Sequence, residues 1–491
     1  MNMKLWQKIM FGLILAVFVY LRVDPIIHHT VPYTYDQGRD FLKVMEMIDA
    51  KRPTFIGPTT GIMGLFHGAW WYYLLTIPSL LTHGSPIAFY YFVFAISLAA
   101  NLWLFQFLKR KFDTPTALVF LAVISVSPYF VKLAFTVSNN VIVPYLLIAL
   151  IGLSFQFFEK DDKRLYFLLG LTLGFVFEFE VAFGLLLIPA YFASALLFRV
   201  LRNKIYSLKN LGLIVAGLAV PFIPRALFEI KNGFIQTKTI IGFFINPKLH
   251  NPAPFQKMLS DRIILFIDYA KSITYGYSLF YAVLMAAFAV IVFFALKKKN
   301  KKTDIALYLA TLVLMLFAIS LFYKDNFWAN YYEGIQYLYL VVFVSACSLL
   351  AKWNKKAAYA LLMVFVIVDL IALNNYNLAK KTVRLEGLAE TQAAFDYIHK
   401  QTGKNDYCLR IYTPPVIPHT YVYLMNWQAK AEGYKISSYN FRDNQCYFVI
   451  ESDVYAFRIK KWREDNTPKG ATMAGKKQLN GNVTVEKWVL K

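Results

Sequence analysis

The sequence has few charged residues: Asp, Glu, Lys and Arg make up only 16% of its 491 residues, whereas 58% are hydrophobic. This balance excludes an ordinary soluble globular chain, in which about a quarter of the residues are charged. Apolar runs near the length needed to cross roughly 30 Å of hydrocarbon recur along most of the chain, which excludes a soluble domain on a single anchor. The composition therefore predicts a mainly α-helical protein that crosses the membrane several times.

Acidic residues are scarce, with 29 Asp and Glu against 52 Lys and Arg. Such a surplus is also found in nucleic-acid-binding proteins, but here the basic residues gather in short loops between apolar runs. Because this is the positive-inside pattern of membrane proteins, we expect no nucleic-acid partner. The clusters assigned to the cytoplasmic side are Lys4 and Lys8; Lys109, Arg110 and Lys111; Lys160, Lys163 and Arg164; Arg199, Arg202, Lys204 and Lys209; Lys297, Lys298, Lys299, Lys301 and Lys302; and Lys352, Lys355 and Lys356.

These clusters fix a topology of about eleven crossings, with the amino terminus inside and the tail outside. The first run, 5–21, is too long for a signal-peptide core and no small-residue cleavage site follows it. The run 69–81 is too short to span, and counting it would place Lys109 outside, so we predict a juxtamembrane or re-entrant helix there. The predicted crossings lie near 5–23, 87–108, 116–131, 141–158, 165–178, 181–198, 211–228, 276–296, 304–322, 335–351 and 357–373.

Residues 1–373 form the predicted membrane module, and the composition changes after it. Residues 374–491 contain no spanning run; a helical stretch over 382–401 is followed by alternating, strand-like pieces. This pattern predicts a small extracytoplasmic α/β domain. Gly170 and Gly174 have the GxxxG spacing, which favours close helix packing over a chemical role.

Cysteine is rare, with three residues in the chain. Cys347 lies in an apolar run and is expected to serve packing. Cys408 and Cys446 lie in two strand-like stretches of the tail, and both a disulfide and two buried thiols stay open at this point. The sequence contains no nucleotide-binding loop, HExxH or CxxC motif. It therefore shows no signature of a soluble enzyme, and we expect no zinc site.

The first external loop, 24–86, carries the most informative side chains. Apolar residues recur at three- and four-residue steps over 35–50, which predicts a helix. Asp36 and Asp40, at i and i+4, then project from one face of its first turns. The helix dipole favours ionised carboxylates there, and Arg39 supports the same charge state.

Other polar side chains fall in segments predicted to lie on the same side of the membrane. Several have a structural alternative: a turn for the histidine, helix ends in water for the acids, and snorkelling for Arg225 and Lys324. For the aromatic run 70–73 the alternative to sugar stacking is an interfacial belt. Asp40 has one too, as a solvated partner of Arg39 or Lys43. The candidates for substrate binding are His67, Glu178, Glu180, Arg225, Lys231, Lys324, Tyr331 and Tyr332.

Two motifs carry a family resemblance. The run FHGAWWYY at 66–73 is similar to an HPPLYY-type pattern, and PFIPRALFEIKNGF at 221–234 is similar to a PxxPxxxFExxxGF segment. Together with an acidic pair soon after the first helix, many helices and an external tail, they make the chain resemble the GT-C superfamily of integral membrane glycosyltransferases. The resemblance is to its protein O-mannosyltransferase and aminoarabinose transferase branch.

The resemblance implies transfer of a sugar from a polyprenyl-phosphate carrier to a lipid, glycan or protein acceptor, on the outer face of a bacterial-type plasma membrane whose lipids surround the chain. Asp36 aligns with the family's loop aspartate and is the expected base. Asp40 is the expected second carboxylate, although many relatives place that acid where this chain has Gln37.

His67 matches the family's histidine before the aromatic run, and Arg225, Lys231 and Lys324 are candidates for the carrier phosphate. No cofactor is expected; distant members of the superfamily bind a divalent cation, the nearer relatives do not. Two other classes remain as alternatives: a transporter or flippase of a lipid-linked saccharide, and a membrane-anchored scaffold with an external binding domain.

Overall fold

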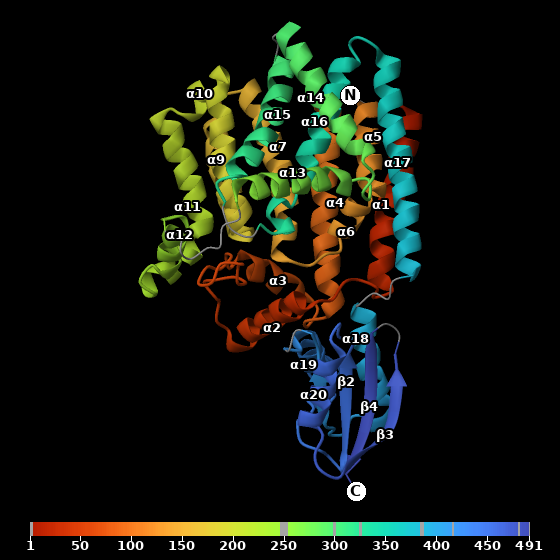
Figure 1. The fold of residues 1–491 in the computed structure, drawn as a ribbon. Helices are drawn as coiled ribbons and strands as arrows, with labels where there is room; N and C mark the ends of the chain where they lie inside the picture. Colours follow the sequence, from red (N-terminus) through yellow and green to blue (C-terminus); the bar gives the residue numbers. More distant parts are fainter. Residues whose placement is uncertain are drawn as a thin grey trace.

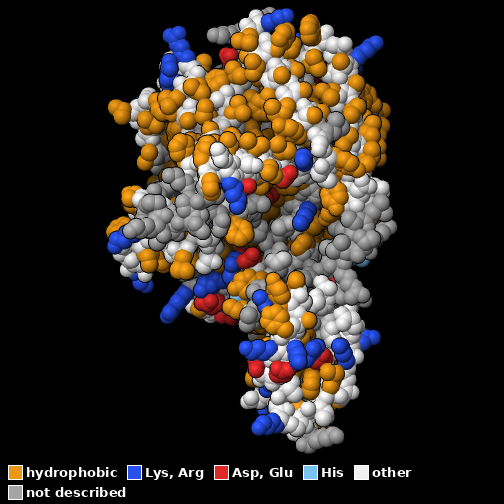
Figure 2. All heavy atoms as spheres, in the orientation of Figure 1, with side chains coloured by type: hydrophobic (Ala, Val, Ile, Leu, Met, Phe, Trp, Pro, Cys, Tyr) orange, Lys and Arg blue, Asp and Glu red, His pale blue; other side chains and the backbone are white. Residues whose placement is uncertain are grey.

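The computed structural model describes residues 3–245, 254–297, 301–323, 327–382, 387–414, 417–479 and 482–490. It consists of a bundle of helices with a small α/β domain at one end, and the amino terminus lies at the other end of the bundle (Figure 1). Hydrophobic side chains cover the side of the bundle, and charged side chains gather toward its ends and on the small domain (Figure 2). This surface is that of a protein embedded in lipid.

The predicted crossings fall on helices, as hydrocarbon requires when each backbone polar group must be paired within its own segment. The one near 116–131 differs, because it is divided between α5 and the short helix α6 (Pro128–Leu133). Among the described residues, seven helices are long and apolar enough to cross a membrane, or eight if the bent pair α9 and α10 (Arg199–Ile205) forms one span. The multi-pass architecture is therefore confirmed, and the count of about eleven stays a prediction. The helices are α1 (Leu5–Ile27), α4 (Pro86–Lys111), α5 (Thr114–Val126), α7 (Val143–Glu159), α8 (Lys163–Phe179), α9 (Val181–Leu197), α11 (Leu208–Lys231), α14 (Leu279–Lys297), α15 (Lys301–Ser320), α16 (Ile335–Leu350) and α17 (Lys355–Thr382).

The GxxxG pair lies where α8 meets α11. A Cβ added at Gly170 would come within 1.9 Å of the Ile214 carbonyl oxygen, and one at Gly174 within 2.9 Å of the Leu218 carbonyl oxygen. Only a residue without a side chain permits this approach of two backbones, so the predicted packing role is confirmed.

Two short helices, α2 (Tyr35–Ala50) and α3 (Trp70–Leu81), lie between the bundle and the small domain (Figure 1). The position of α3 agrees with the predicted juxtamembrane helix. At the start of α2 the Gln37 side chain accepts a hydrogen bond from the Thr34 backbone N–H at 2.6 Å. Gln37, which stands where relatives have an acid, therefore serves to cap the helix.

Within the described residues, five further helical elements lie between the crossing helices along the chain. They are α6 (Pro128–Leu133), the 3-10 helix η1 (Asn139–Ile142), α12 (Ile235–Ile245), α13 (Phe255–Ser272) and the 3-10 helix η3 (Ala329–Tyr332). Of these, η1 and η3 border the site described below.

The small domain is a four-stranded sheet of order β1-β2-β4-β3, in which β1 and β2 are parallel and the other pairs antiparallel. Helix α17 passes residue 373 before the domain begins. A disulfide joins Cys408 to Cys446 beside the β1–β2 pair, which decides between the two alternatives for these cysteines. The elements are α18 (Leu388–Thr402), β1 (Leu409–Tyr412), α19 (His419–Glu432), β2 (Gln445–Glu451), α20 (Ala456–Asn466), β3 (Ala471–Gln478) and β4 (Val483–Leu490).

The small domain docks on the first external loop through α19 and α2. A Cβ at Gly38 would come within 2.4 Å of the Thr420 backbone nitrogen, so the two helices are in direct backbone contact. The Tyr33 hydroxyl donates to the Thr420 carbonyl oxygen at 2.9 Å. The domain therefore holds the start of α2, which carries Asp36 and Asp40.

Candidate functional site

A cleft of about 260 Å³ opens where the first external loop meets the junction of α8 and α9. Its walls come from five separate stretches of the chain: the start of α2, the loop before α3, the residues around η1, the start of α9 and the residues around η3. About half of the lining surface is polar, which distinguishes it from the lipid-facing surface. It consists of Asp36, Arg39, Thr59, Thr60, Gly61, Ile62, Leu65, His67, Ser138, Asn139, Asn140, Glu180, Val181, Ala182, Leu185, Tyr323, Trp328, Asn330 and Tyr331.

Asp36 presents an accessible carboxylate to this cleft. It lies in the first turn of α2 with its side chain 63% exposed, and its Oδ1 is 2.8 Å from a guanidinium nitrogen of Arg39. The same guanidinium reaches Asp40 Oδ1 at 2.8 Å. Arg39 therefore bridges the two acids, and only Asp36 of the pair lines the cleft.

Asp40 is buried behind Asp36, with a side chain only 3% exposed. The indole N–H of Trp71 donates to its Oδ2 at 2.8 Å, and the Tyr72 hydroxyl lies 3.4 Å from its Oδ1. Burial raises the pKa of Asp40 to about 6, against the lowering effect of Arg39 and Trp71. Asp40 is thus placed to hold Arg39 rather than to touch a ligand in the cleft.

His67 lines the cleft as a neutral imidazole. Burial, together with the positive charges of Arg225 and Arg39, lowers the pKa of His67 to about 3. The Val181 backbone N–H lies 3.5 Å from its Nδ1 and is directed at it as a donor, which leaves Nε2 to carry the proton. His67 can therefore offer one hydrogen bond but no positive charge.

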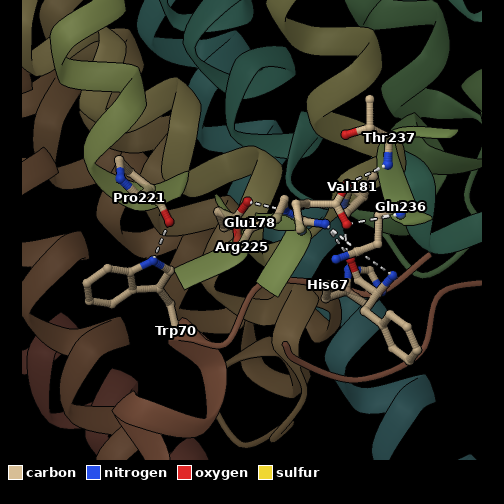
Figure 3. Close-up of polar contacts among 10 residues, drawn as sticks. His67, Trp70, Glu178, Val181, Pro221, Arg225, Gln236 and Thr237 are labelled. Atoms are coloured by element: carbon tan, nitrogen blue, oxygen red, sulfur yellow. Dashed lines mark hydrogen bonds and ion pairs between the residues drawn. The ribbon is translucent and has the colours of Figure 1, made fainter. Parts of the chain in front are cut away.

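The buried ion pair of Glu178 and Arg225 holds the turn that contains His67 (Figure 3). Arg225 Nε is 2.6 Å from Glu178 Oε1, and its Nη1 donates to the Phe66 carbonyl oxygen at 3.0 Å. The Glu178 carbonyl oxygen accepts from the Gly68 N–H at 2.6 Å. Both charged groups thus lie behind the cleft, where they contact the loop backbone and, through Arg225, the Gln236 side chain.

Gly68 is required at this turn by the same pair. A Cβ there would lie 2.0 Å from Glu178 Oε2 and 2.7 Å from Glu178 Cβ. The next residues continue the anchoring: the Trp70 indole N–H donates to the Pro221 carbonyl oxygen at 2.7 Å (Figure 3). The two motifs that carry the family resemblance, FHGAWWYY and PFIPRALFEIKNGF, are therefore in contact.

Two other predicted residues, Glu180 and Tyr331, line the cleft. Burial, and the nearby negative charge of Glu333, raise the pKa of Glu180 to about 8, so it holds a proton at neutral pH. Tyr332 is turned into the core, where its ring lies 5.8 Å from that of Phe266. Glu180 therefore adds a proton donor to the cleft, and Tyr331 adds an aromatic hydroxyl.

Of the remaining predicted cations, none is found among the described residues that line the cleft. Lys231 is exposed in the last turn of α11, and Lys324 lies outside the described residues. Among the described lining residues Arg39 is the one cation. Within the same part of the chain, no three His, Cys, Asp or Glu side chains converge in a way that could hold a metal ion.

The sequence reasoning did not select several lining residues, including Asn139, Asn140 and Trp328. Ser138, Asn139 and Asn140 form a polar break between two apolar runs, and this break was the available signal. The Asn139 amide donates to the Phe179 carbonyl oxygen at 2.7 Å, which ties the break to the end of α8. Trp328 had no comparable signal, because aromatic residues are abundant in the chain.

The structure thus combines a multi-pass helical bundle, a polar cleft with an accessible carboxylate and an extramembrane domain that docks on the loop bordering the cleft. A family model described as dolichyl-phosphate-mannose-protein mannosyltransferase matches residues 67–227. This stretch contains His67, Glu178, Glu180 and Arg225. Comparison with curated protein sequences finds no match.

Solved structures align with this chain at low sequence identity. ArnT from Cupriavidus metallidurans bound to undecaprenyl phosphate aligns with a TM-score of 0.57 at 8% identity, over 98% of both chains. The apo state of the same ArnT aligns with a TM-score of 0.47 at 11% identity, over 98% of this chain and 97% of that one. The Archaeoglobus fulgidus oligosaccharyltransferase in complex with Zn and sulfate reaches 0.46 at 14% identity, over 80% of this chain and 55% of the other.

The fold assignment rests on the first of these structures. The resemblance to the GT-C superfamily, with an ArnT-like fold, is therefore confirmed.

Proposed function

We propose that the chain is a glycosyltransferase that moves a hexosyl or pentosyl group from a polyprenyl-phosphate carrier to an acceptor hydroxyl in the cleft, with Asp36 as general base. One observation carries the proposal: among two acids on the same face of α2, Asp36 alone opens into the polar cleft. The undecaprenyl phosphate bound by the ArnT neighbour supports a carrier of this chemical class.

In the proposed step the acceptor oxygen attacks the anomeric carbon and its proton passes to a carboxylate oxygen of Asp36. The bond between the anomeric carbon and the carrier oxygen breaks, and the carrier phosphate leaves with the electron pair. Arg39 orients Asp36, since its guanidinium contacts both acids. Asp40 acts through Arg39 as a positioning residue.

The other lining residues suit substrate binding. Glu180, protonated at neutral pH, can donate to a sugar hydroxyl or a phosphate oxygen, and His67 and Tyr331 each offer a further hydrogen bond. Glu178 and Arg225 shape the site from behind. The assignment of Lys231 and Lys324 as cations that bind the carrier phosphate stays a prediction.

Transfer without a divalent cation is part of the proposal. We expect that adding a chelator to membranes containing the protein leaves the transfer rate unchanged. A loss of activity that added Mg²⁺, Mn²⁺ or Zn²⁺ restores would contradict this part.

The orientation proposed for the chain has the amino terminus in the cytoplasm and the small domain outside. Labelling of single cysteines introduced at Lys8 and at Asn377 in intact cells tests it. Reagent that cannot cross the membrane should modify the second position and leave the first unmodified; the reverse pattern would overturn the orientation.

The decisive experiment compares Asp36→Asn with Asp49→Asn in membranes supplied with a polyprenyl-phosphate sugar. Asp49 lies on the same helix with a side chain 55% exposed and is paired with Lys430 of the small domain, so it is a matched control outside the cleft. Loss of a general base should lower the transfer rate of Asp36→Asn by at least about 100-fold. Full activity of this variant, with carrier binding retained, would refute the assignment of the base.

A further inference from the structure

A second cavity of the molecule is an apolar groove on the side of the bundle. It has a volume of about 430 Å³ and runs between α1 and α17, with α5 as its floor. The three helices lie side by side in Figure 1, and α5 packs against both of the others. Trp6 and Leu13 stand on one wall, Tyr359 and Met363 on the other. None of its lining residues belongs to the polar cleft.

The groove is about one membrane leaflet deep. Its floor extends along α5 from Pro115 to Val126, a rise of about 17 Å at 1.5 Å per residue. Half of a hydrocarbon core of roughly 30 Å is close to this length. Trp6, Leu13 and Met363 are exposed along its rims, so the groove opens sideways to the lipid.

Among the described residues, exposed positive charge gathers at one end of this groove. The end that bears Trp6 and Tyr359 lies away from the small domain, where α1 and α17 begin (Figure 1). Helix amino termini carry partial positive charge, and four exposed lysines flank these two. They are Lys4, Lys8, Lys355 and Lys356.

Two charged groups lie near the ends of the groove, and each makes hydrogen bonds within the chain. Asp113, at the start of α5, accepts hydrogen bonds from the Thr116 N–H at 2.8 Å and the Tyr359 hydroxyl at 3.1 Å. At the opposite end the buried Arg22 donates to the carbonyl oxygens of Ile124 and Ser125 at 2.7 and 3.0 Å. The end of the groove that bears the four lysines therefore attracts anions. At the opposite end, the guanidinium of Arg22 is directed at backbone carbonyl oxygens.

We infer that the groove binds an acyl chain of an anionic phospholipid from the leaflet opposite the small domain, with the lipid phosphate held by Lys4, Lys8, Lys355 and Lys356. An apolar channel of one-leaflet depth with cations at its headgroup end matches this amphiphile in length and charge. The carrier of the proposed reaction would place its phosphate at the other end of the bundle, beside the cleft. A phospholipid bound here would hold α1 and α17 on α5.

Native mass spectrometry of the full chain, with phosphatidylglycerol or phosphatidylcholine added, tests the charge of the headgroup. The variant K4Q/K8Q/K355Q/K356Q should bind phosphatidylglycerol at least about tenfold more weakly than the unaltered chain. The control K163Q/R164Q/R202Q/K209Q removes four exposed cations from the same end of the bundle, away from the groove. It should change the affinity less than twofold; an equal loss in both variants would mean attraction to general surface charge and would overturn the site.

The variant Ala122→Trp tests the groove itself, because it fills the floor while leaving all four lysines in place. Bound phosphatidylglycerol should fall at least about tenfold, whereas Leu227→Trp, on a lipid-exposed position of α11, should retain it. Thermal unfolding without added lipid shows that each variant is folded, and Val119→Phe replaces Ala122→Trp if that variant is not. Retained binding with the groove filled, or one-for-one displacement by undecaprenyl phosphate, would overturn the proposal.

Discussion

Replacing Asp40 by Asn separates charge from shape at the buried acid of α2. Burial raises the pKa of Asp40 from an ordinary 3.8 to about 6 in the folded chain. The folded state therefore binds a proton more readily than the unfolded state, and this contribution to stability is complete below pH 4 and is lost as the pH rises through 6. A difference of about two pKa units corresponds to about 3 kcal/mol, at 1.36 kcal/mol per unit.

An asparagine has no such titration, so the free-energy difference between the unaltered chain and Asp40→Asn should change by about 3 kcal/mol between pH 4 and pH 7. The unaltered chain should lose stability relative to the variant over this range. The assay is thermal unfolding of both proteins in detergent at pH 4, 5, 6, 7 and 8, with Asp49→Asn as an exposed control on the same helix. Parallel unfolding midpoints for the unaltered chain and Asp40→Asn would refute the reasoning.

Two further variants test the turn behind the cleft and the small domain. Gly68→Ala should cost about 1–3 kcal/mol of stability and lower transfer, because the new Cβ displaces Glu178; Gly12→Ala, which meets nothing within 4 Å, should leave both unchanged. Serine at Cys408 and Cys446 opens a loop of 38 residues and should destabilise the small domain by about 4 kcal/mol. Limited proteolysis with and without reductant measures this loss, and equal cleavage of the variant and the unaltered chain would contradict it.

The sequence by itself determined that the chain is a multi-pass helical membrane protein. Apolar segments and the basic loops between them predicted a helix at every crossing, and the shortness of the run 69–81 predicted that α3 would stay at the membrane surface. These features are local, because lipid requires each spanning segment to pair its own backbone. The i, i+4 spacing likewise placed Asp36 and Asp40 on one face of α2.

Only the tertiary structure decided what each polar side chain does. Trp71 and Tyr72 of α3 cover Asp40 and leave Asp36 open, although the two acids share a helix face. Glu178 and Arg225, 47 residues apart, meet behind the cleft and engage the loop. Contacts of this kind depend on how helices distant in the sequence pack against one another. The pattern of residues within a single segment therefore cannot predict them.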